Sequence, residues 1–235
     1  TIRNHEMEMG LNIPSLRDTW YKTSYLLDEQ QTANGLAKTR YENYKAQPLQ
    51  YEFPNSHSGI LPDKGQSRPK AAILREKGSN SEREMANAMY LAGFDVKDVH
   101  MTDLISGREA LEDIQFLGAV LGSAKGWAGA IKYNEKANKV IQNFFTRPDT
   151  LSVGICNGCQ LFMELDLINP DHETHGKMTF KDSHKHESAF TSVKVQKNNS
   201  VMLSSLEGAT LGVWISHGEG KFHLPQTEEQ YDIVA

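Results

Sequence analysis

The stretch Leu151-Ser-Val-Gly-Ile-Cys-Asn-Gly-Cys-Gln160 decides the fold, because it joins two regular elements across a very short turn. It starts with an apolar run, continues with small and polar residues from Gly154 to Gly158, and leads into the apolar pattern of Leu161-Phe-Met-Glu-Leu-Asp-Leu167. This order predicts a short buried strand, a sharp turn, and a helix that begins just after Cys156. Glycine is expected on both flanks because such a turn tolerates a Cβ poorly.

The predicted strand, turn and helix resemble a nucleophile elbow, which lifts a nucleophilic side chain above the end of a sheet. Cys156 then lies at a helix N-terminus, where the helix dipole and free N–H groups favour an anion and hence the thiolate. Cys159 follows at a C-x-x-C spacing. Three other interpretations therefore stay open: a cysteine buried for packing, a redox dithiol, and half of a zinc site.

Length and composition fit one α/β domain with an appendage. The 235 residues are 38% hydrophobic and 23% charged, with a formal net charge of -5. This charge gives no reason to expect nucleic acid as a partner. No membrane contact is expected either, since no apolar run approaches the roughly 20 residues of a membrane span. The two cysteines and the polar start of the chain predict a reducing, cytoplasmic location.

Short apolar stretches alternate with helical patterns from Lys70 onward, which predicts an open, mostly parallel sheet with helices on both faces. Ser79 or Ser81 is expected to cap the first of these helices, which ends at Gly93. Ligands bind beyond the carboxyl ends of such strands, where Gly78–Asn80 and Cys156 fall. The expected strands are 70–75, 94–100, 114–120 and the one that delivers Cys156, and a helix is expected over 128–145.

The two ends of the chain differ in character from this middle part. Residues 189–196 and 210–222 alternate in polarity and predict an antiparallel flap beside the sheet. At the start, Ser15 is expected to cap a helix over 15–28, and a second helical stretch follows over 33–45. An extended segment at 47–59 and a linker at 61–69 complete this N-terminal part of the chain. The predicted domains are 1–66, a small helical and extended segment, and 67–235.

Gly-Ile-Cys-Asn-Gly-Cys-Gln at 154–160 is similar to the Gly-x-Cys-x-Gly-x-Gln signature of the class I glutamine amidotransferases. Its Cys-Asn-Gly-Cys-Gln form resembles that of the phosphoribosylformylglycinamidine synthases, and Asp18–Asp28 resembles the synthetase tail that precedes the amidotransferase domain in their long, single-chain form. The resemblance implies a flavodoxin-like fold and a glutaminase role in de novo purine biosynthesis. The whole enzyme would use glutamine and ATP to convert formylglycinamide ribotide to its amidine.

The resemblance also implies roles for individual residues. Cys156 matches the nucleophile that attacks the glutamine carboxamide, forms a glutamyl thioester and releases ammonia. The backbone N–H of Asn157 is expected to donate to the oxyanion, and Gln160 matches the glutamine that helps to hold the substrate. Asn80 and His217 lie in two further segments that border the glutamine pocket in the family, Arg75–Asn80 and Trp214–Gly220.

Two parts of the family's pattern do not occur in this sequence. The Pro-His-x-Glu-Arg stretch, which supplies the catalytic histidine and glutamate, does not appear before Ala235. A Gly-Gly-Phe-Ser loop with the second oxyanion donor is also not seen, because Gly118-Ala-Val-Leu-Gly-Ser123 runs straight through. Either this loop is deleted, or the natural chain has a segment there that this sequence lacks. We favour the second explanation, since a deletion would spoil an otherwise intact site, and we expect the chain alone to be inactive.

No cofactor or metal is expected in this chain, because it lacks a P-loop and the resemblance assigns ATP and magnesium to synthetase domains upstream. The expected partners are glutamine and those domains. One alternative is the glutamine amidotransferase of another synthetase. Another is a non-catalytic α/β module that binds metal through its cysteines and the histidines at 172, 175, 184 and 186. We favour solvated loop histidines, since no second C-x-x-C occurs.

Overall fold

The computed structural model describes residues 1–46, 51–60, 67–120 and 122–235, and these form two compact units. The sequence-based division at residue 66 is a different one and stays a prediction. Unit 1 comprises Thr1–Asn55, Phe180–Lys221 and Asp232–Ala235, and unit 2 comprises Ser56–Thr179 and Phe222–Tyr231.

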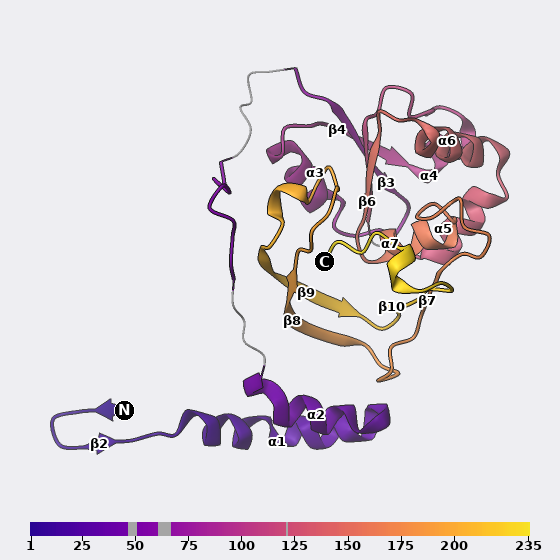
Figure 1. Ribbon diagram of the computed structural model, residues 1–235. Helices are drawn as coiled ribbons and strands as arrows, with labels where there is room; N and C mark the ends of the chain where they lie inside the picture. The colour runs from indigo at the N-terminus through magenta and orange to yellow at the C-terminus, as the bar shows by residue number, and fades with distance from the viewer. Residues whose placement is uncertain (47–50, 61–66, 121) are drawn as a thin grey trace. The chain divides into compact units, whose positions relative to one another are not determined.

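Unit 2 contains the predicted open sheet, with four parallel strands in the order β4-β3-β5-β6 (Figure 1). The register aligns Leu74, Ala119 and Gly154 in one row across three strands, so the loops after these residues leave the sheet at one edge. The strands are β3 (Lys70–Arg75), β4 (Asp95–His100), β5 (Phe116–Ala119) and β6 (Leu151–Gly154).

The strand that leads to Cys156 was predicted to be buried, and that prediction is wrong. Among the residues that the structure describes, strand β6 lies at the edge of the sheet and has β5 as its one neighbour. Leu151 is 40% exposed and Ile155 just after the strand is 53% exposed. Apolar content alone does not tell an edge strand from a central one, because the helix layers on the two faces of a parallel sheet cover both kinds of strand.

Helices cover both faces of this sheet, as Figure 1 shows for α3 on one side and α4 and α6 on the other. Side chains of a strand alternate between faces, so Ile73 packs with Met89 of α3 while Leu74 joins the larger core under the other helices. Trp127 and Ile141 anchor that larger core. The helices of unit 2 are α3 (Glu82–Leu91), α4 (Met101–Ser106), α5 (Ala124–Lys132), α6 (Glu135–Thr146) and α7 (Asn157–Glu164).

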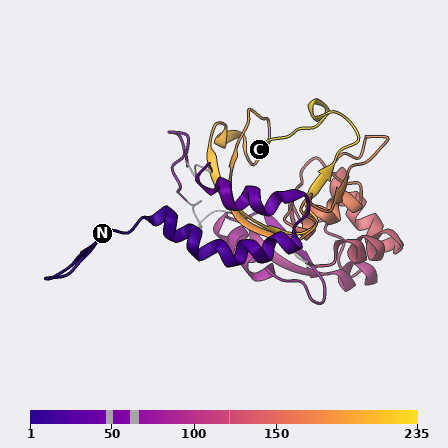
Figure 2. The same cartoon turned by 90° about the horizontal axis from the view of Figure 1, so that it is seen from below.

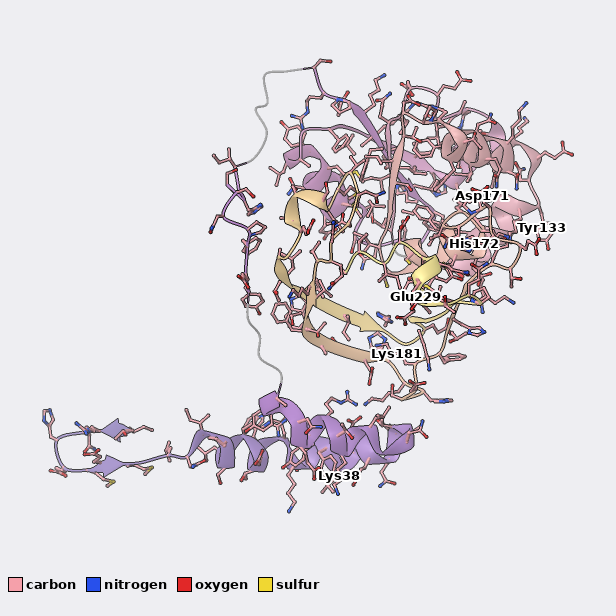
Figure 3. All side chains as sticks on the ribbon, in the orientation of Figure 1. Lys38, Tyr133, Asp171, His172, Lys181 and Glu229 are labelled. Atoms are coloured by element: carbon pink, nitrogen blue, oxygen red, sulfur yellow. The ribbon has the colours of Figure 1, made fainter. Side chains whose placement is uncertain are left out.

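The single helix predicted over 128–145 is two helices, α5 and α6. The side chain of Asn134 accepts a hydrogen bond from the backbone N–H of Ala137 at 2.9 Å and so caps α6. Tyr133 ends α5 with its side chain 92% exposed (Figure 3). An exposed tyrosine followed by an asparagine cap interrupts the helix, although the apolar spacing on either side continues.

Two further caps differ from the prediction. Ser81 occupies the N-cap of α3, but its side chain makes no capping hydrogen bond, and its φ of 68° places it in the left-handed region. Helix α1 (Ile13–Gln31) begins before Ser15, because the side chain of Asn12 accepts from the Ser15 N–H at 3.0 Å. Pro14 lies in the first turn of α1, where its missing N–H costs no hydrogen bond.

Unit 1 contains the predicted antiparallel flap, formed by β8 (Glu187–Lys194) and β9 (Thr210–His217). It also contains α1 and α2 (Leu36–Glu42), which lie side by side in Figure 2, with the rings of Tyr25 and Tyr41 stacked at 4.5 Å. The short remaining strands of the described residues, in either unit, are β1 (Ile2–Arg3), β2 (Glu8–Met9), β7 (Lys177–Thr179) and β10 (Lys221–His223). The 3-10 turns of the two units are at 33–35, 43–46, 204–206 and 228–230.

Two predicted segments lie partly outside the described residues. These are the extended stretch, at residues 47–50, and the linker, at residues 61–66. Within the described part of the chain, none of the helices has both the length and the apolar character that a membrane crossing requires.

Candidate active site

Cys156 stands at the tip of a strained turn between β6 and α7. Its backbone has φ 56° and ψ −112°, a conformation that a residue with a Cβ rarely adopts. Helix α7 begins at the next residue, as the sequence predicts. A non-glycine residue in such a conformation between a strand and a helix matches the nucleophile elbow, in which strain holds the side chain up and away from the sheet.

The glycines on both sides of Cys156 are required by close packing. A Cβ on Gly154 would lie 2.7 Å from the carbonyl oxygen of Gly158. A Cβ on Gly158 would lie 2.0 Å from the carbonyl oxygen of Ala119 in β5, which is too close for any side chain. The start of α7 therefore touches the end of β5 directly, and this contact places Cys156 at the carboxyl edge of the sheet.

Backbone hydrogen bonds fix the turn around Cys156. The N–H of Gly158 donates to Ile155 at 2.9 Å, and the N–H of Gln160 donates to Cys156 at 3.2 Å. Asn157 is the first helical residue, so its N–H has no acceptor inside the helix and is directed out of the helix N-terminus. This is the arrangement that an oxyanion donor needs, beside the residue that would carry the attacking sulfur.

Gln160 and Asn157 are joined through their side chains, a contact that the sequence analysis missed. The carboxamide nitrogen of Asn157 donates to the carboxamide oxygen of Gln160 at 2.7 Å. The sequence contains a signal for this contact, because residues three apart on a helix are neighbours and both side chains are amides, which can hydrogen-bond to each other. The bond fixes which way the Gln160 amide faces, and so directs its nitrogen away from Asn157.

The two cysteines of the C-x-x-C pair are both free thiols and differ in environment. Burial raises the pKa of the Cys159 thiol, and the nearby Cys156 raises it further. Cys159 is therefore held as the neutral thiol. Its position in the first turn of α7, behind Cys156, fits a packing role.

Asn80 lies in the loop after β3, at the same edge of the sheet as the elbow. Strand β5 lies between β3 and β6, so their ends are separated by two strand spacings, roughly 10 Å. Asn80 is exposed, and its side-chain oxygen accepts from the N–H of Ser81 at 2.8 Å. The loop that holds Asn80 thus follows the carboxyl end of β3, as the elbow follows the carboxyl end of β6.

His217 lies in unit 1, at the end of β9, whereas Cys156, Asn157, Gln160 and Asn80 all lie in unit 2. The structure thus brings together four of the five predicted site residues on one sheet edge, and it describes His217 within the other unit. The imidazole packs so closely on Gly220 that a Cβ there would lie 1.7 Å from the ring.

Burial lowers the pKa of His217, and the charges of Lys181 and His186 lower it further, whereas Glu187 opposes them. Lys181, labelled in Figure 3, lies on the segment that leads into β8. The ring is therefore favoured in its neutral form at neutral pH. Its Nδ1 atom is buried and has no hydrogen-bond partner among the described residues.

The histidines of the alternative metal site do not gather with the cysteines. Across residues 1–46, 51–60, 67–120 and 122–235, no group of three or more His, Cys, Asp or Glu side chains is arranged to hold a metal ion. His172 instead contacts the ring of Tyr231 edge-on, with centroids 5.3 Å apart (Figure 3). His184 occupies a turn with φ 56°.

Leu121, at the junction where the family's oxyanion loop is expected, lies outside the described residues. On its two sides, Val120 is buried and Gly122 lies against the ring of Trp127, where a Cβ would approach to 2.5 Å.

Comparison with known proteins identifies the family. A model of the CobB/CobQ-like glutamine amidotransferase domain matches residues 68–235. A solved structure of PurLQS from Thermotoga maritima is similar to the chain in fold, with a TM-score of 0.53 and 21% identity over 67% of this chain and 70% of that one.

Curated relatives extend the likeness to most of the chain. A probable phosphoribosylformylglycinamidine synthase of Caenorhabditis elegans is 40% identical over 93% of this chain and 18% of that protein. The Homo sapiens phosphoribosylformylglycinamidine synthase is 37% identical over 95% of this chain and 18% of that protein. The chain thus spans less than a fifth of the length of these relatives. The elbow with its cysteine and the family match agree, and the chain belongs to the family of CobB/CobQ-like glutamine amidotransferase domains.

Proposed function

We propose that this chain is the glutamine-hydrolysing part of a phosphoribosylformylglycinamidine synthase, and that it supplies ammonia for de novo purine biosynthesis. The observation that carries the proposal is Cys156 in its strained conformation at the N-terminus of α7. The relatives named phosphoribosylformylglycinamidine synthase, at 37% and 40% identity, support the choice of synthase. ATP, magnesium and the ribotide substrate then belong to synthetase domains upstream in a longer, cytoplasmic protein.

The chemistry follows from the groups at the elbow. The Cys156 thiolate attacks the carboxamide carbon of glutamine, and the negative charge that develops on the oxygen is stabilised by the N–H of Asn157. The C–N bond breaks, the nitrogen takes a proton and leaves as ammonia, and a glutamyl thioester remains. Water then attacks the thioester, which releases glutamate and restores the thiol. Gln160 and Asn80 hold the substrate from the same sheet edge.

The proton transfers require a general acid and a general base. We assign neither role to any of the five predicted site residues. The resembling family provides them from a Pro-His-x-Glu-Arg segment, which residues 1–235 do not contain. We therefore expect these residues alone to bind glutamine and to present Cys156, but not to turn the substrate over.

The experiment that tests the proposal is labelling with a diazo-ketone or chloroketone analogue of glutamine, followed by peptide mapping. Selective modification of Cys156 that glutamine prevents is the expected result. The Cys159→Ala variant should label normally and Cys156→Ala should not. Modification of both thiols without glutamine protection, or of neither thiol in the full-length protein, would contradict the proposal. Stoichiometric zinc in an unlabelled protein would favour the metal-binding alternative.

In the full-length synthase, Cys156→Ala should abolish glutamine-dependent synthesis and leave ammonia-dependent synthesis intact. The reason is that ammonia added to the medium bypasses the thioester step. Both rates are measured by formation of the amidine product, with Cys159→Ala as the matched control that keeps both. Loss of both activities together in Cys156→Ala would show that the two reactions are not divided between separate sites.

A further inference from the structure

The side chain of Asn157 has no part in the chemistry proposed above, which uses only the backbone N–H of that residue. Its carboxamide nitrogen donates to the carboxamide oxygen of Gln160 at 2.7 Å, and both residues are half-buried at the elbow. The Gly-x-Cys-x-Gly-x-Gln signature specifies the residue at 160 but leaves the one at 157 open. The hydrogen bond therefore joins a residue that the signature leaves open to the glutamine that is expected to hold the substrate.

Gln160 is held at both its backbone and its side chain. Its backbone N–H donates to the carbonyl oxygen of Cys156 at 3.2 Å, and its side-chain oxygen accepts from Asn157. The last torsion of a glutamine side chain is broad and roughly two-fold, so without a partner the oxygen and the nitrogen of the amide could exchange places. An exchange in Gln160 alone would set the N–H groups of two amides against each other, and the bond to Asn157 opposes it.

The direction of this hydrogen bond decides what Gln160 offers to a ligand. With the oxygen turned to Asn157, the nitrogen and its N–H donors lie at the other end of the amide group. Such a donor binds an acceptor, and glutamine carries acceptor oxygens on its carboxamide and on its α-carboxylate. The backbone N–H of Asn157 is a second donor at the same helix N-terminus, which favours oxygen atoms that carry negative charge. Asn157 thus acts on the site directly through its N–H and indirectly through Gln160.

We propose that the Asn157 side chain is a positioning residue, which turns the Gln160 carboxamide so that its nitrogen binds an oxygen of the glutamine substrate. This inference rests on the proposed function, which supplies glutamine as the ligand. It concerns substrate binding more than the chemical step, because the proposed oxyanion donor is a backbone N–H that a substitution of the side chain retains. The preference for an oxygen acceptor at this point of the site follows from the direction of one hydrogen bond.

A purely structural role is the competing explanation. Polar pairs three residues apart stabilise a helix, so the same bond could only hold the first turn of α7 and with it the strained Cys156. The two explanations differ in what removal of the Asn157 side chain changes. A structural role predicts slower alkylation of Cys156 and a lower free energy of unfolding. Positioning predicts weaker binding of glutamine beside a thiol of normal reactivity.

The test is a double-mutant cycle in the full-length synthase, with KM for glutamine and kcat of glutamine-dependent synthesis as readouts. We expect Asn157→Ala to raise KM about tenfold while kcat changes less than about twofold. Gln160→Ala should raise KM at least as much. The double variant should be no worse than Gln160→Ala, because Asn157 acts on the substrate through that side chain. Asn143→Ala, at an exposed position of α6, is the matched control and should leave KM unchanged.

Asn157→Asp tests the direction of the bond. A carboxylate accepts hydrogen bonds but does not donate them, so it attracts the Gln160 nitrogen and turns the oxygen toward the substrate. Positioning therefore predicts a larger KM for Asn157→Asp than for Asn157→Ala, and this difference should vanish in the Gln160→Ala background. A structural role predicts the reverse order, since a carboxylate near a helix N-terminus is stabilising.

Additive effects of the two alanine substitutions on KM would overturn the proposal. An unchanged KM in Asn157→Ala, or slower alkylation of Cys156 by iodoacetamide in that variant, would overturn it too. Ammonia-dependent synthesis is measured on the same samples and should keep the wild-type rate. Cys156→Ala separates this inference from the proposed function. Positioning alone is rejected if Cys156→Ala loses glutamine-dependent synthesis while Asn157→Ala keeps the wild-type KM, whereas the proposed function is rejected as well if Cys156→Ala retains that synthesis.

Discussion

At Gly158 the first turn of α7 meets the last residue of β5, and the contact leaves no room for a side chain. A Cβ would lie 2.0 Å from the carbonyl oxygen of Ala119. We expect Gly158→Ala to move α7 away from the sheet, to lower the free energy of unfolding by about 1–3 kcal/mol, and to reduce labelling of Cys156. Urea unfolding and the glutamine analogue measure the two effects.

Gly129 provides the matched control for that substitution. It lies in α5, and a Cβ there would meet nothing within 4 Å. Gly129→Ala should therefore leave labelling unchanged and raise stability by about 0.5–1 kcal/mol, since alanine favours helix more than glycine does. If Gly158→Ala behaved like Gly129→Ala, close packing would not be the reason for glycine at the elbow.

The two cysteines should differ in how their rates of alkylation depend on pH. Burial raises the pKa of Cys159, so its reactive thiolate is scarce at neutral pH and becomes abundant only as the pH rises further than for a free thiol. At about pH 7 we expect iodoacetamide to modify Cys156 first, and Cys159 to react comparably only at a pH above the ordinary pKa of a thiol. Mass spectrometry of the peptide that holds both thiols, in Cys156→Ser and Cys159→Ser variants, follows each one. Equal rates at pH 7 would contradict this assignment.

At the scale of elements, the cap of α6 shows how one side chain separates two helices. The Asn134 side chain accepts from the Ala137 N–H, and without it that donor loses its partner. Asn134→Ala should lower the free energy of unfolding by about 1 kcal/mol. Asn143→Ala, the same substitution at an exposed site within α6, should be neutral or slightly stabilising, because alanine has the higher helix propensity. Thermal unfolding of both variants gives the comparison, and equal losses would argue against the cap.

Strands and helices were predicted well where a periodic pattern and a glycine bounded them, as for β3 and α3. The predicted helix boundaries were wrong where a polar side chain makes a local capping hydrogen bond, because apolar periodicity does not reveal such a bond. Asn12 began α1 before Ser15, and Asn134 divided the helix predicted over 128–145. His100 began α4, which has only six residues and so too few turns to show a period.

At the scale of the molecule, the apolar core is concentrated in unit 2. Both clusters of buried hydrophobic residues belong to it. In the described part of unit 1, the buried residues are Ala37, Ser183, Val195 and Ala209, all of them small or medium in size. Burial of apolar area supplies most of the stability of a unit. Unit 1 is therefore the less stable of the two when residues 1–235 are studied by themselves.

Native-state hydrogen exchange should show this difference directly. Amides of β8 and β9 should exchange through openings of lower free energy than those of β3 and β5, because fewer buried apolar contacts oppose the opening of unit 1. Low concentrations of urea should raise the exchange of unit 1 before that of unit 2. A single free energy shared by all four strands would mean that the two units unfold together.

The parallel sheet, the elbow at Cys156 and the family follow from the amino-acid sequence alone, since glycine, cysteine and apolar spacing act through local geometry. Asn157, Gln160 and Cys156 were found together because they lie within one helical turn. Tertiary structure decided that β6 is an edge strand and that Gly158 touches Ala119, because neighbours across a sheet are set by chain topology. It also decided that Ile13, Trp20 and Leu27 of α1 are exposed, since only the packed chain shows which faces of a helix are covered.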